Sequence, residues 1–158
     1  VVHCACQPGY TGNPFTGCHE QATQRNCSLN KPSGRKVYRA QRIDMVSFYG
    51  AMVRCLTDGG RLATIESKEE NEQVVEEIRK TNLRNVRFWT SGSNLYGGQW
   101  VWLSSGEHLK EYADWGPGQP TFKRYENCLS LFPTGNSSWI WKNGRCSTYG
   151  ASVCEYFE

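Results

Sequence analysis

Eight cysteines constrain this chain more than any other feature. They are Cys4, Cys6, Cys18, Cys27, Cys55, Cys128, Cys146 and Cys154. Their number is even and their spacing matches no paired CxxC zinc knuckle, so we predict disulfides, which persist in oxidising compartments. Two N-x-S sequons, at Asn26 and Asn136, are glycosylation candidates and agree with passage through a secretory pathway. The cysteines and sequons together predict a secreted, extracellular protein.

Length and composition favour one ordinary domain with a small appendage. The chain has 158 residues, of which 38% are hydrophobic, and this is enough for a single apolar core. It contains no apolar run long enough for a membrane helix, so we expect no membrane span. The net charge is only +3, without the block of like charges that is typical of a nucleic-acid-binding arm. We therefore expect no nucleic acid partner.

The first 30 residues differ in composition from the rest. They are rich in Cys, Gly, Pro, Asn and Thr and carry almost no aliphatic side chains, so this segment must rely on its cross-links. The run C-A-C-Q-P-G-Y-T-G at 4–12, closed by Cys18, predicts a tight hairpin whose glycines supply the turn conformations. We therefore divide the chain into a disulfide-rich segment, 1–30, and a main domain, 31–158.

Two amphipathic helices are predicted in the first half of the main domain. The first has Asp44 as its expected N-cap and ends at Gly59-Gly60. A strand-like link at 61–65 follows, and Ser67 to Glu70 then has the form of a capping box that opens the second helix. The residues expected to face inward are Met45, Phe48, Ala51, Met52, Cys55 and Leu56 in the first helix and Val74, Val75 and Ile78 in the second.

The second half is aromatic and Gly-rich, and predicts short strands between long loops. The candidate strands are Val86 to Thr90, Gln99 to Leu103, Asn127 to Phe132, Trp139 to Lys142 and Ala151 to Tyr156. A front half with two helices and a back half of short strands indicates an α+β fold.

The N-terminal motif resembles the C-terminal half of an EGF-like module, which has the pattern C-x-C-x-P-G-Y-x-G and a final cysteine. The first three cysteines of such a module are absent, so the module is truncated here. The resemblance implies a disulfide between Cys6 and Cys18, and it leaves Cys4 without its usual partner. Cys27 is the nearest unassigned thiol, and we expect Cys4 to pair either with it or with another chain.

Several short motifs follow in a fixed order from residue 36 onward. They are G-R-L-A-T-I at 60–65, W-V-W at 100–102, W-G-P-G at 115–118, E-N-C at 126–128 and V-C-E at 153–155. With the cysteines, this order resembles the C-type lectin-like domain over about residues 36–158. The family pattern implies the disulfides Cys55–Cys154 and Cys128–Cys146. The phrase F-W-T-S-G at 88–92 is similar to one common in arthropod members.

In calcium-dependent members of that family, sugar hydroxyls bind a calcium ion that is held by side-chain oxygens. The resemblance places Gln119-Pro120-Thr121, Glu126 and Trp141-Lys142-Asn143 at this site. Only Glu126 is an anion among them, although calcium affinity follows the charge of the oxygen ligands, and Lys142 would repel the ion. We therefore expect no cofactor, with a weakened calcium site as the alternative.

The accessory calcium site of the family also departs from its pattern. Asn94 and Asn127 stand where carboxylates are usual, and Gly97 stands near a position where a glutamate is usual. Both calcium sites are therefore expected to be lost.

The ligand-binding candidates gather in the same loop region. They are Gln119, Thr121, Lys123, Arg124, Glu126, Lys142 and Asn143. Glu126 and Lys142 either pair across the former calcium site or are both solvated. The cations Lys123, Arg124, Lys142 and Arg145 either attract sulfated glycans, lipopolysaccharide phosphates or an acidic protein, or form an ordinary hydrophilic rim.

No catalytic centre can be assembled from the sequence. His3, His19 and His108 lie in unrelated segments, and the disulfides remove the cysteines as nucleophiles. The resemblance assigns structural positions to Trp100, Trp102, Trp115 and Trp141. We therefore expect a protein that is not an enzyme.

Three functions remain open. The first is a calcium-independent module of arthropod innate immunity that binds a protein or an anionic glycan. The second is a calcium-dependent lectin that uses a weakened site around Gln119 and Glu126. The third is a structural extracellular subunit, in which a bridge through Cys4 or Cys27 builds a dimer with a related lectin. Calcium-dependent retention on sugar would favour the second, and a mass that halves on reduction would favour the third.

Overall fold

The computed structural model describes residues 10–13, 17–20, 32–96 and 98–158. The chain separates into two compact units, Val1–Pro32 and Ser33–Glu158, two residues beyond the boundary expected from composition. In the first unit, strand β1 (Tyr10–Asn13) pairs antiparallel with β2 (Gly17–Glu20). Cys4, Cys6 and Cys27 lie outside the described residues, so the EGF-like interpretation and the pairs Cys4–Cys27 and Cys6–Cys18 stay predictions.

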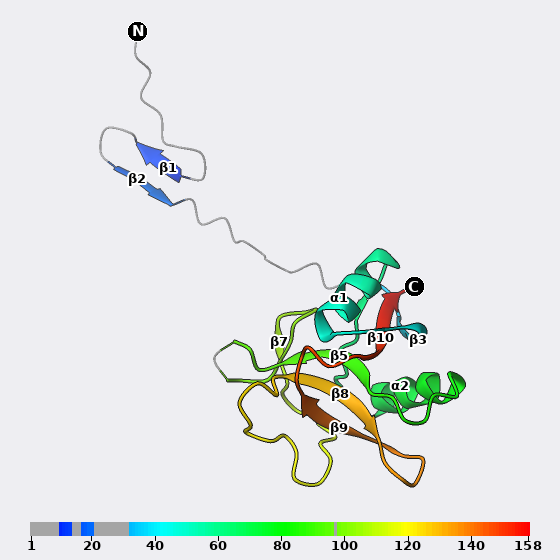
Figure 1. The fold of residues 1–158 in the computed structure, drawn as a ribbon. Helices are drawn as coiled ribbons and strands as arrows, with labels where there is room; N and C mark the ends of the chain where they lie inside the picture. Colours follow the sequence, from blue (N-terminus) through cyan, green and yellow to red (C-terminus); the bar gives the residue numbers. More distant parts are fainter. Residues whose placement is uncertain (1–9, 14–16, 21–31, 97) are drawn as a thin grey trace. The chain divides into compact units, whose positions relative to one another are not determined.

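The second unit has the predicted α+β fold, with two helices and one mixed sheet (Figure 1). The helices are α1 (Phe48–Thr57) and α2 (Lys68–Lys80). The strands are β3 (Lys36–Val46), β4 (Arg61–Leu62), β5 (Phe88–Ser93), β6 (Val101–Trp102), β7 (Glu107–His108), β8 (Cys128–Pro133), β9 (Trp139–Gly144) and β10 (Gly150–Phe157). Within the described part of the chain, neither helix is long and apolar enough to cross a membrane.

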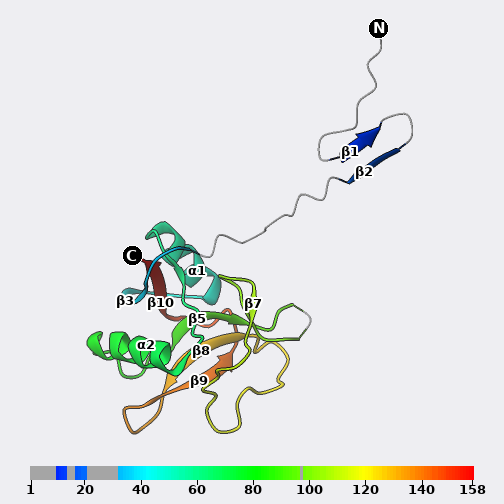
Figure 2. The same cartoon turned by 180° about the vertical axis from the view of Figure 1, so that it is seen from behind.

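The C-terminal strand β10 lies in the middle of the sheet. It pairs antiparallel with β3 and β4 and parallel with β5, and β5 in turn pairs with β6 and β8. Figure 2 shows the β8–β9 hairpin on the far side of β5 from β10. The pairing of β3 with β10 brings the two ends of this unit together, and Arg35 and Glu158 exchange backbone hydrogen bonds of 2.8 and 3.0 Å.

Helix α1 begins later than predicted. Its N-cap is Ser47, whose side chain accepts a hydrogen bond from the backbone N–H of Gly50, and the prediction of Asp44 as N-cap is wrong. Asp44 belongs to β3 and forms an ion pair with Arg54 at 2.8 Å, because β3 continues to Val46. Phe48, Ala51 and Cys55 are buried as predicted, whereas Leu56 is 62% exposed and Met45, which belongs to β3, is 38% exposed rather than inward-facing.

Helix α2 begins as predicted. Ser67 is its N-cap and accepts from the backbone N–H of Glu70, while the Glu70 carboxylate accepts from the backbone N–H of Glu66 at 2.7 Å. The first bond satisfies a donor that the first turn of a helix leaves free, and the second holds the residue that precedes the N-cap. Val74 and Ile78 are fully buried, and Val75 is partly buried against the same core.

The predicted strands all exist, with shifted ends. β5 extends three residues beyond the predicted Thr90, whereas β6 is limited to Val101–Trp102. The short strand β7, Glu107–His108, was not predicted, because both side chains are exposed and give no apolar signal.

Two disulfides cross the core. They join Cys55 to Cys154 and Cys128 to Cys146, with Cα–Cα distances of 5.4 and 5.2 Å, which are the two pairs that the family resemblance implied. Cys55–Cys154 fastens α1 to the central strand β10. Cys128–Cys146 fastens the start of β8 to the segment after β9, beside the long loop that precedes β8.

A buried ion cluster surrounds Glu155 on β10. Its side chain is fully buried, with one carboxylate oxygen 2.5 Å from the Arg61 Nε and the other accepting from the backbone N–H and hydroxyl of Thr64 at 2.7 and 2.8 Å. Burial raises the pKa of Glu155, while the Thr64 donors and the charges of Lys36 and Arg61 oppose this rise. The carboxylate therefore links β10 to β4 and to the residues that follow it.

Replacing Glu155 with alanine should lower the free energy of unfolding by about 3 kcal/mol or more, because buried donors and cations would lose their acceptor. Chemical denaturation with urea measures this change. Glu158→Ala is the matched control, since Glu158 is exposed and its contact with Arg39 spans 3.5 Å. An equal decrease in the free energy of unfolding of the two variants would contradict a structural role for the buried Glu155 carboxylate.

Candidate functional site

The long loop between β7 and β8 lies against strand β9. The backbone N–H of Gly116 donates to Trp141 at 3.0 Å, and the N–H of Trp141 donates to Asp114 at 3.1 Å. The Trp141 indole N–H, which is buried, donates to the Asn71 side chain on α2 at 2.9 Å. The loop entrance is therefore fixed to the core before the candidate site residues begin.

Asn143 holds the far part of this loop. Its side chain is 1% exposed. Its oxygen accepts from the backbone N–H of Thr121 at 2.8 Å, and its nitrogen donates to the backbone carbonyls of Thr121 and Glu126 at 2.9 and 2.7 Å. Gln119 joins this group by accepting from the backbone N–H of Asn143 at 3.3 Å. One buried amide thus binds both ends of the segment 121–126.

Glu126 closes the same ring of contacts. The Thr121 hydroxyl donates to the Glu126 carboxylate at 2.7 Å. Gln119, Thr121, Glu126 and Asn143, which the family resemblance assigned to one site, are therefore brought together, but they bind one another. We call this group the amide clamp.

Lys142 lies apart from the amide clamp. Successive side chains of a strand point to opposite faces, and the Lys142 ammonium lies over the Phe132 ring, 4.6 Å from its centroid. Among the ion pairs of residues 32–96 and 98–158 there is none between Glu126 and Lys142. The hypothesis that this pair replaces the calcium ion is therefore wrong, because β9 directs Lys142 and Asn143 in opposite directions.

Arg87 is a further cation that was not among the predicted site residues. Its guanidinium lies 5.1 Å from the Trp89 ring centroid and 5.5 Å from that of Phe132, so it shares Phe132 with Lys142. Burial lowers its pKa, and the negative charge of Glu126 partly offsets this effect. Arg87 packs closely against the backbone of Gly150. A Cβ atom added at Gly150 would lie 2.5 Å from the Arg87 Cγ, so any larger residue there would collide with Arg87. Arg87 thus adds a half-buried positive charge beside Lys142.

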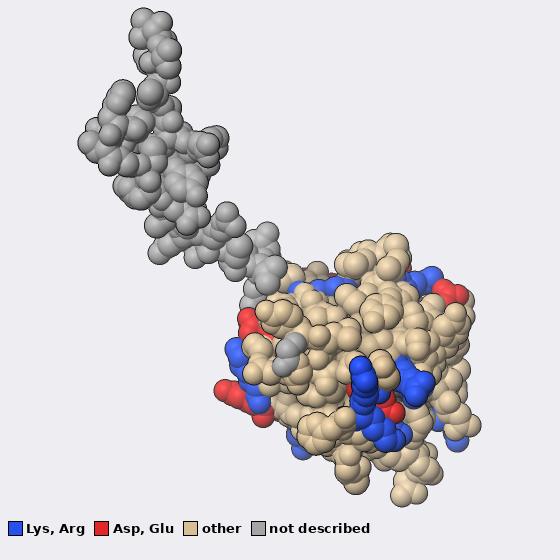
Figure 3. Space-filling view, turned by 60° about the vertical axis from the view of Figure 1, so that its left-hand side comes forward, with Lys and Arg blue, Asp and Glu red and all other residues tan. Residues whose placement is uncertain are grey.

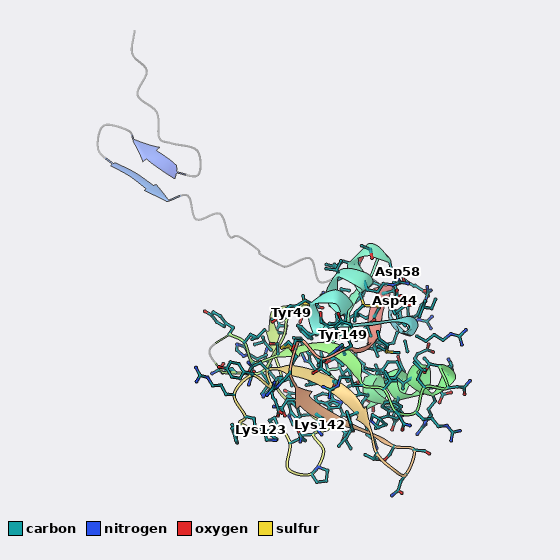
Figure 4. All side chains as sticks on the ribbon, viewed as in Figure 1. Asp44, Tyr49, Asp58, Lys123, Lys142 and Tyr149 are labelled. Carbon is teal, nitrogen blue, oxygen red and sulfur yellow. A yellow bond between two sulfur atoms is a disulfide. The ribbon has the colours of Figure 1, made fainter. Side chains whose placement is uncertain are left out.

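The other predicted cations lie on the surface. Lys123, Arg124 and Arg145 are exposed, and Lys142 is half-buried. Figure 3 shows one face on which Lys and Arg side chains gather around a small acidic area, and Figure 4 labels Lys123 and Lys142 on the β9 and long-loop side of the domain. We call Lys123, Arg124, Lys142 and Arg145, together with the loop segment 119–126, the loop face.

Comparisons with known proteins identify the family. The Lectin C-type domain model matches residues 44–156, which is more than half of the chain. The chain belongs to the C-type lectin domain family. It is 30% identical to Salivary C-type lectin 1 of Aedes albopictus over 118 residues, which cover 70% of this chain and 76% of the relative. It is 27% identical to tetranectin of Bos taurus over 141 residues, which cover 87% of this chain and 67% of that protein.

Solved structures show the same fold at lower identity. Human lithostathine has a TM-score of 0.69 at 18% identity, and the match covers 97% of this chain and 100% of that chain. The C-type lectin domain of murine dendritic cell inhibitory receptor 2, solved in complex with N-glycan, has a TM-score of 0.65 at 17% identity and covers 98% and 100% of the two chains. These C-type lectin folds agree with the two helices, mixed sheet and disulfides described above.

The accessory positions carry amides in this C-type lectin domain. Asn94 and Asn127 contact through their backbones, with the N–H of Asn94 donating to Asn127 at 3.1 Å. Gly97 lies outside the described residues. Within 32–96 and 98–158 no three His, Cys, Asp or Glu side chains group as metal ligands would. His3 lies outside the described residues, and His108 is exposed on β7.

The tryptophans take the structural positions that the resemblance gave them. Trp102 and Trp141 are buried, and their rings meet edge to face at 5.6 Å. Trp115 contacts Trp141 at 5.9 Å and Trp100 at 4.9 Å. These rings connect the long loop to the core rather than forming a free stacking surface.

The sequon at Asn136 lies in the turn between β8 and β9, where the asparagine is exposed, and Asn26 lies outside the described residues. Glycosylation at both asparagines stays a prediction.

Replacing Asn143 with alanine should free the segment 121–126, because two carbonyls and one N–H would lose a buried partner at about 1–3 kcal/mol each. Hydrogen exchange followed by mass spectrometry should show faster exchange at Thr121. Asn85→Ala, at an exposed asparagine, is the control. Unchanged exchange at Thr121 in the Asn143 variant would show that the amide clamp does not hold the loop.

Proposed function

We propose that this C-type lectin domain is a secreted recognition protein that binds an anionic glycan or an acidic protein surface without calcium, in arthropod innate immunity. The observation that carries the proposal is the amide clamp. Asn143 makes, with hydrogen bonds, the link between Thr121 and Glu126 that an ion would otherwise supply. The loop face is then ordered without a cofactor.

The side chains of the clamp fit a calcium ion poorly. Calcium takes about six to eight oxygen ligands, and its affinity depends on their charge. Here Glu126 is the single anion, and its carboxylate already accepts from Thr121. The Asn143 oxygen is engaged by the Thr121 N–H. Binding an ion would therefore require these bonds to break, which supports calcium-independent recognition.

The charge of the loop face favours an anionic ligand. Lys123, Arg124 and Arg145 are exposed, whereas Glu126 is half-buried and hydrogen bonded. Guanidinium and ammonium groups form charge-assisted hydrogen bonds with sulfate, phosphate and carboxylate. This arrangement supports the anionic alternative over an ordinary rim.

Secretion and a role in immunity rest on separate support. The disulfides suit an oxidising compartment, and the mosquito relative is named for saliva. The immune role rests on the likeness to arthropod members. The likeness also supports a binding role rather than catalysis, since C-type lectin folds are generally those of recognition proteins.

Calcium should not raise the melting temperature of the full chain. Calcium at a concentration of a hundred times its dissociation constant would raise the free energy of unfolding by about 2.7 kcal/mol, so binding would be detected easily. Differential scanning calorimetry in EGTA and then in millimolar calcium makes the comparison. A clear rise in calcium would contradict the proposal and favour the calcium-dependent lectin.

The full chain should bind immobilised heparin, a sulfated polysaccharide, in EGTA. Lys142→Gln combined with Arg145→Gln should weaken this binding at least about tenfold, since a hydrogen bond to a charged group contributes about 1.5–3 kcal/mol. Lys68→Gln with Arg79→Gln, on exposed positions of α2, gives the same charge change as a control. Equal weakening by the two pairs would mean that net charge, rather than the loop face, governs binding.

A further inference from the structure

The tip of the long loop, residues 122–125, exposes two aromatic rings. Phe122 is 101% exposed, so its ring has no packing partner in the domain, and Tyr125 is 61% exposed. A large apolar ring in water is unfavourable, and a group of exposed apolar side chains commonly marks a docking surface. The tip therefore requires an explanation beyond the folding of the domain.

The exposure of Phe122 does not follow from a loose loop. The amide clamp holds the residues on both sides of the tip, through the N–H and carbonyl of Thr121 and the carbonyl of Glu126. A turn within the tip adds a bond from the N–H of Glu126 to the carbonyl of Lys123 at 3.2 Å. The ring is thus displayed on a fixed backbone.

The two central residues of the tip are cations. Lys123 and Arg124 stand between the aromatic residues and are exposed, and the Arg124 guanidinium lies 5.2 Å from the Tyr125 ring centroid. The neighbouring loop adds Leu95 and Tyr96, which are 49% and 82% exposed, and it is joined to the end of the long loop by the bond between Asn94 and Asn127. Within the tip itself, two exposed aromatic rings therefore flank two exposed cations.

We propose that the loop tip docks on an anionic phospholipid bilayer, with Phe122 entering the boundary between headgroups and acyl chains. Lys123 and Arg124 contact the anionic headgroups. The proposal goes beyond the recognition of glycan or protein proposed above, and it shares with it the calcium-free order of the loop.

The geometry favours a bilayer over a sugar or a protein. An aromatic platform for sugars lies flat against neighbouring side chains, whereas the Phe122 ring is clear of all of them. A protein hot spot enters a pocket of matching shape, while a bilayer accepts any apolar projection. Aromatic side chains prefer the interfacial region of membranes, and nearby Lys and Arg side chains add attraction to anionic lipid.

Co-sedimentation of the full chain with lipid vesicles in EGTA tests this. One vesicle is phosphatidylcholine alone, and the other contains phosphatidylserine at about 30 mol% to supply the anionic surface potential. The protein should sediment with the second vesicle and remain in solution with the first. Equal binding to both, or to neither, would overturn the proposal.

Two variants separate insertion of the Phe122 ring into the bilayer from electrostatic attraction to the anionic headgroups. Phe122→Ser should weaken vesicle binding about tenfold by removing the apolar anchor, and Lys123→Gln with Arg124→Gln should weaken it by a similar factor. Tyr49→Ser is the control, since Tyr49 is an aromatic residue on α1 that is 54% exposed. Because Phe122 packs against nothing, Phe122→Ser should melt at the wild-type temperature. An equal loss in Phe122→Ser and Tyr49→Ser would overturn the proposal.

A direct measure of depth uses Phe122→Trp with vesicles that carry bromine on the acyl chains. Quenching of tryptophan fluorescence should exceed that of the wild type, whose six tryptophans are the background. Quenching equal to the wild type would exclude insertion. Failure of heparin binding in EGTA would overturn the function proposed above but not this one, which is decided by the vesicle measurements alone.

Discussion

The rest of the domain depends on the placement of β10, the last strand, in the middle of the sheet. Cys154 joins it to α1, and Glu155, the next residue, gathers Arg61 and Thr64 around a buried carboxylate. A covalent bond and an ionic cluster thus meet at adjacent residues on opposite faces of one strand. β5 pairs with β10, and its other edge pairs with β8, which in turn pairs with β9. The strands that hold the long loop are therefore anchored to β10 through β5.

In the loop face, one buried amide joins the two ends of a loop segment. A calcium ion organises a loop from its centre by collecting oxygen atoms, and its occupancy depends on concentration and pH. Asn143 collects backbone groups from Thr121 and Glu126 from within the chain itself. The hydrogen bonds that hold the segment 121–126 therefore come from the chain's own groups, while Lys123 and Arg124 within it stay exposed.

Much of this could be predicted from the sequence, and the exceptions have physical reasons. Apolar spacing predicted both helices, but it could not distinguish Ser47 from Asp44 as the cap, because the apolar pattern of β3 continues into that of α1. Family motifs placed Lys142 and Asn143 together, whereas the alternation of β9 separates them. Arg87 was missed since its surroundings, Phe132, Gly144 and Gly150, are distant in the sequence and meet only in the folded sheet.

The pairing of β3 with β10 has a mechanical consequence. The backbones of Arg35 and Glu158 meet at the outer end of this antiparallel pair, so both ends of the domain leave it at one point. Tension between them would load the terminal hydrogen bonds first and separate the strands one bond after another. The Cys55–Cys154 bridge would halt that separation at α1, and the clamped loop beyond it would carry none of the load.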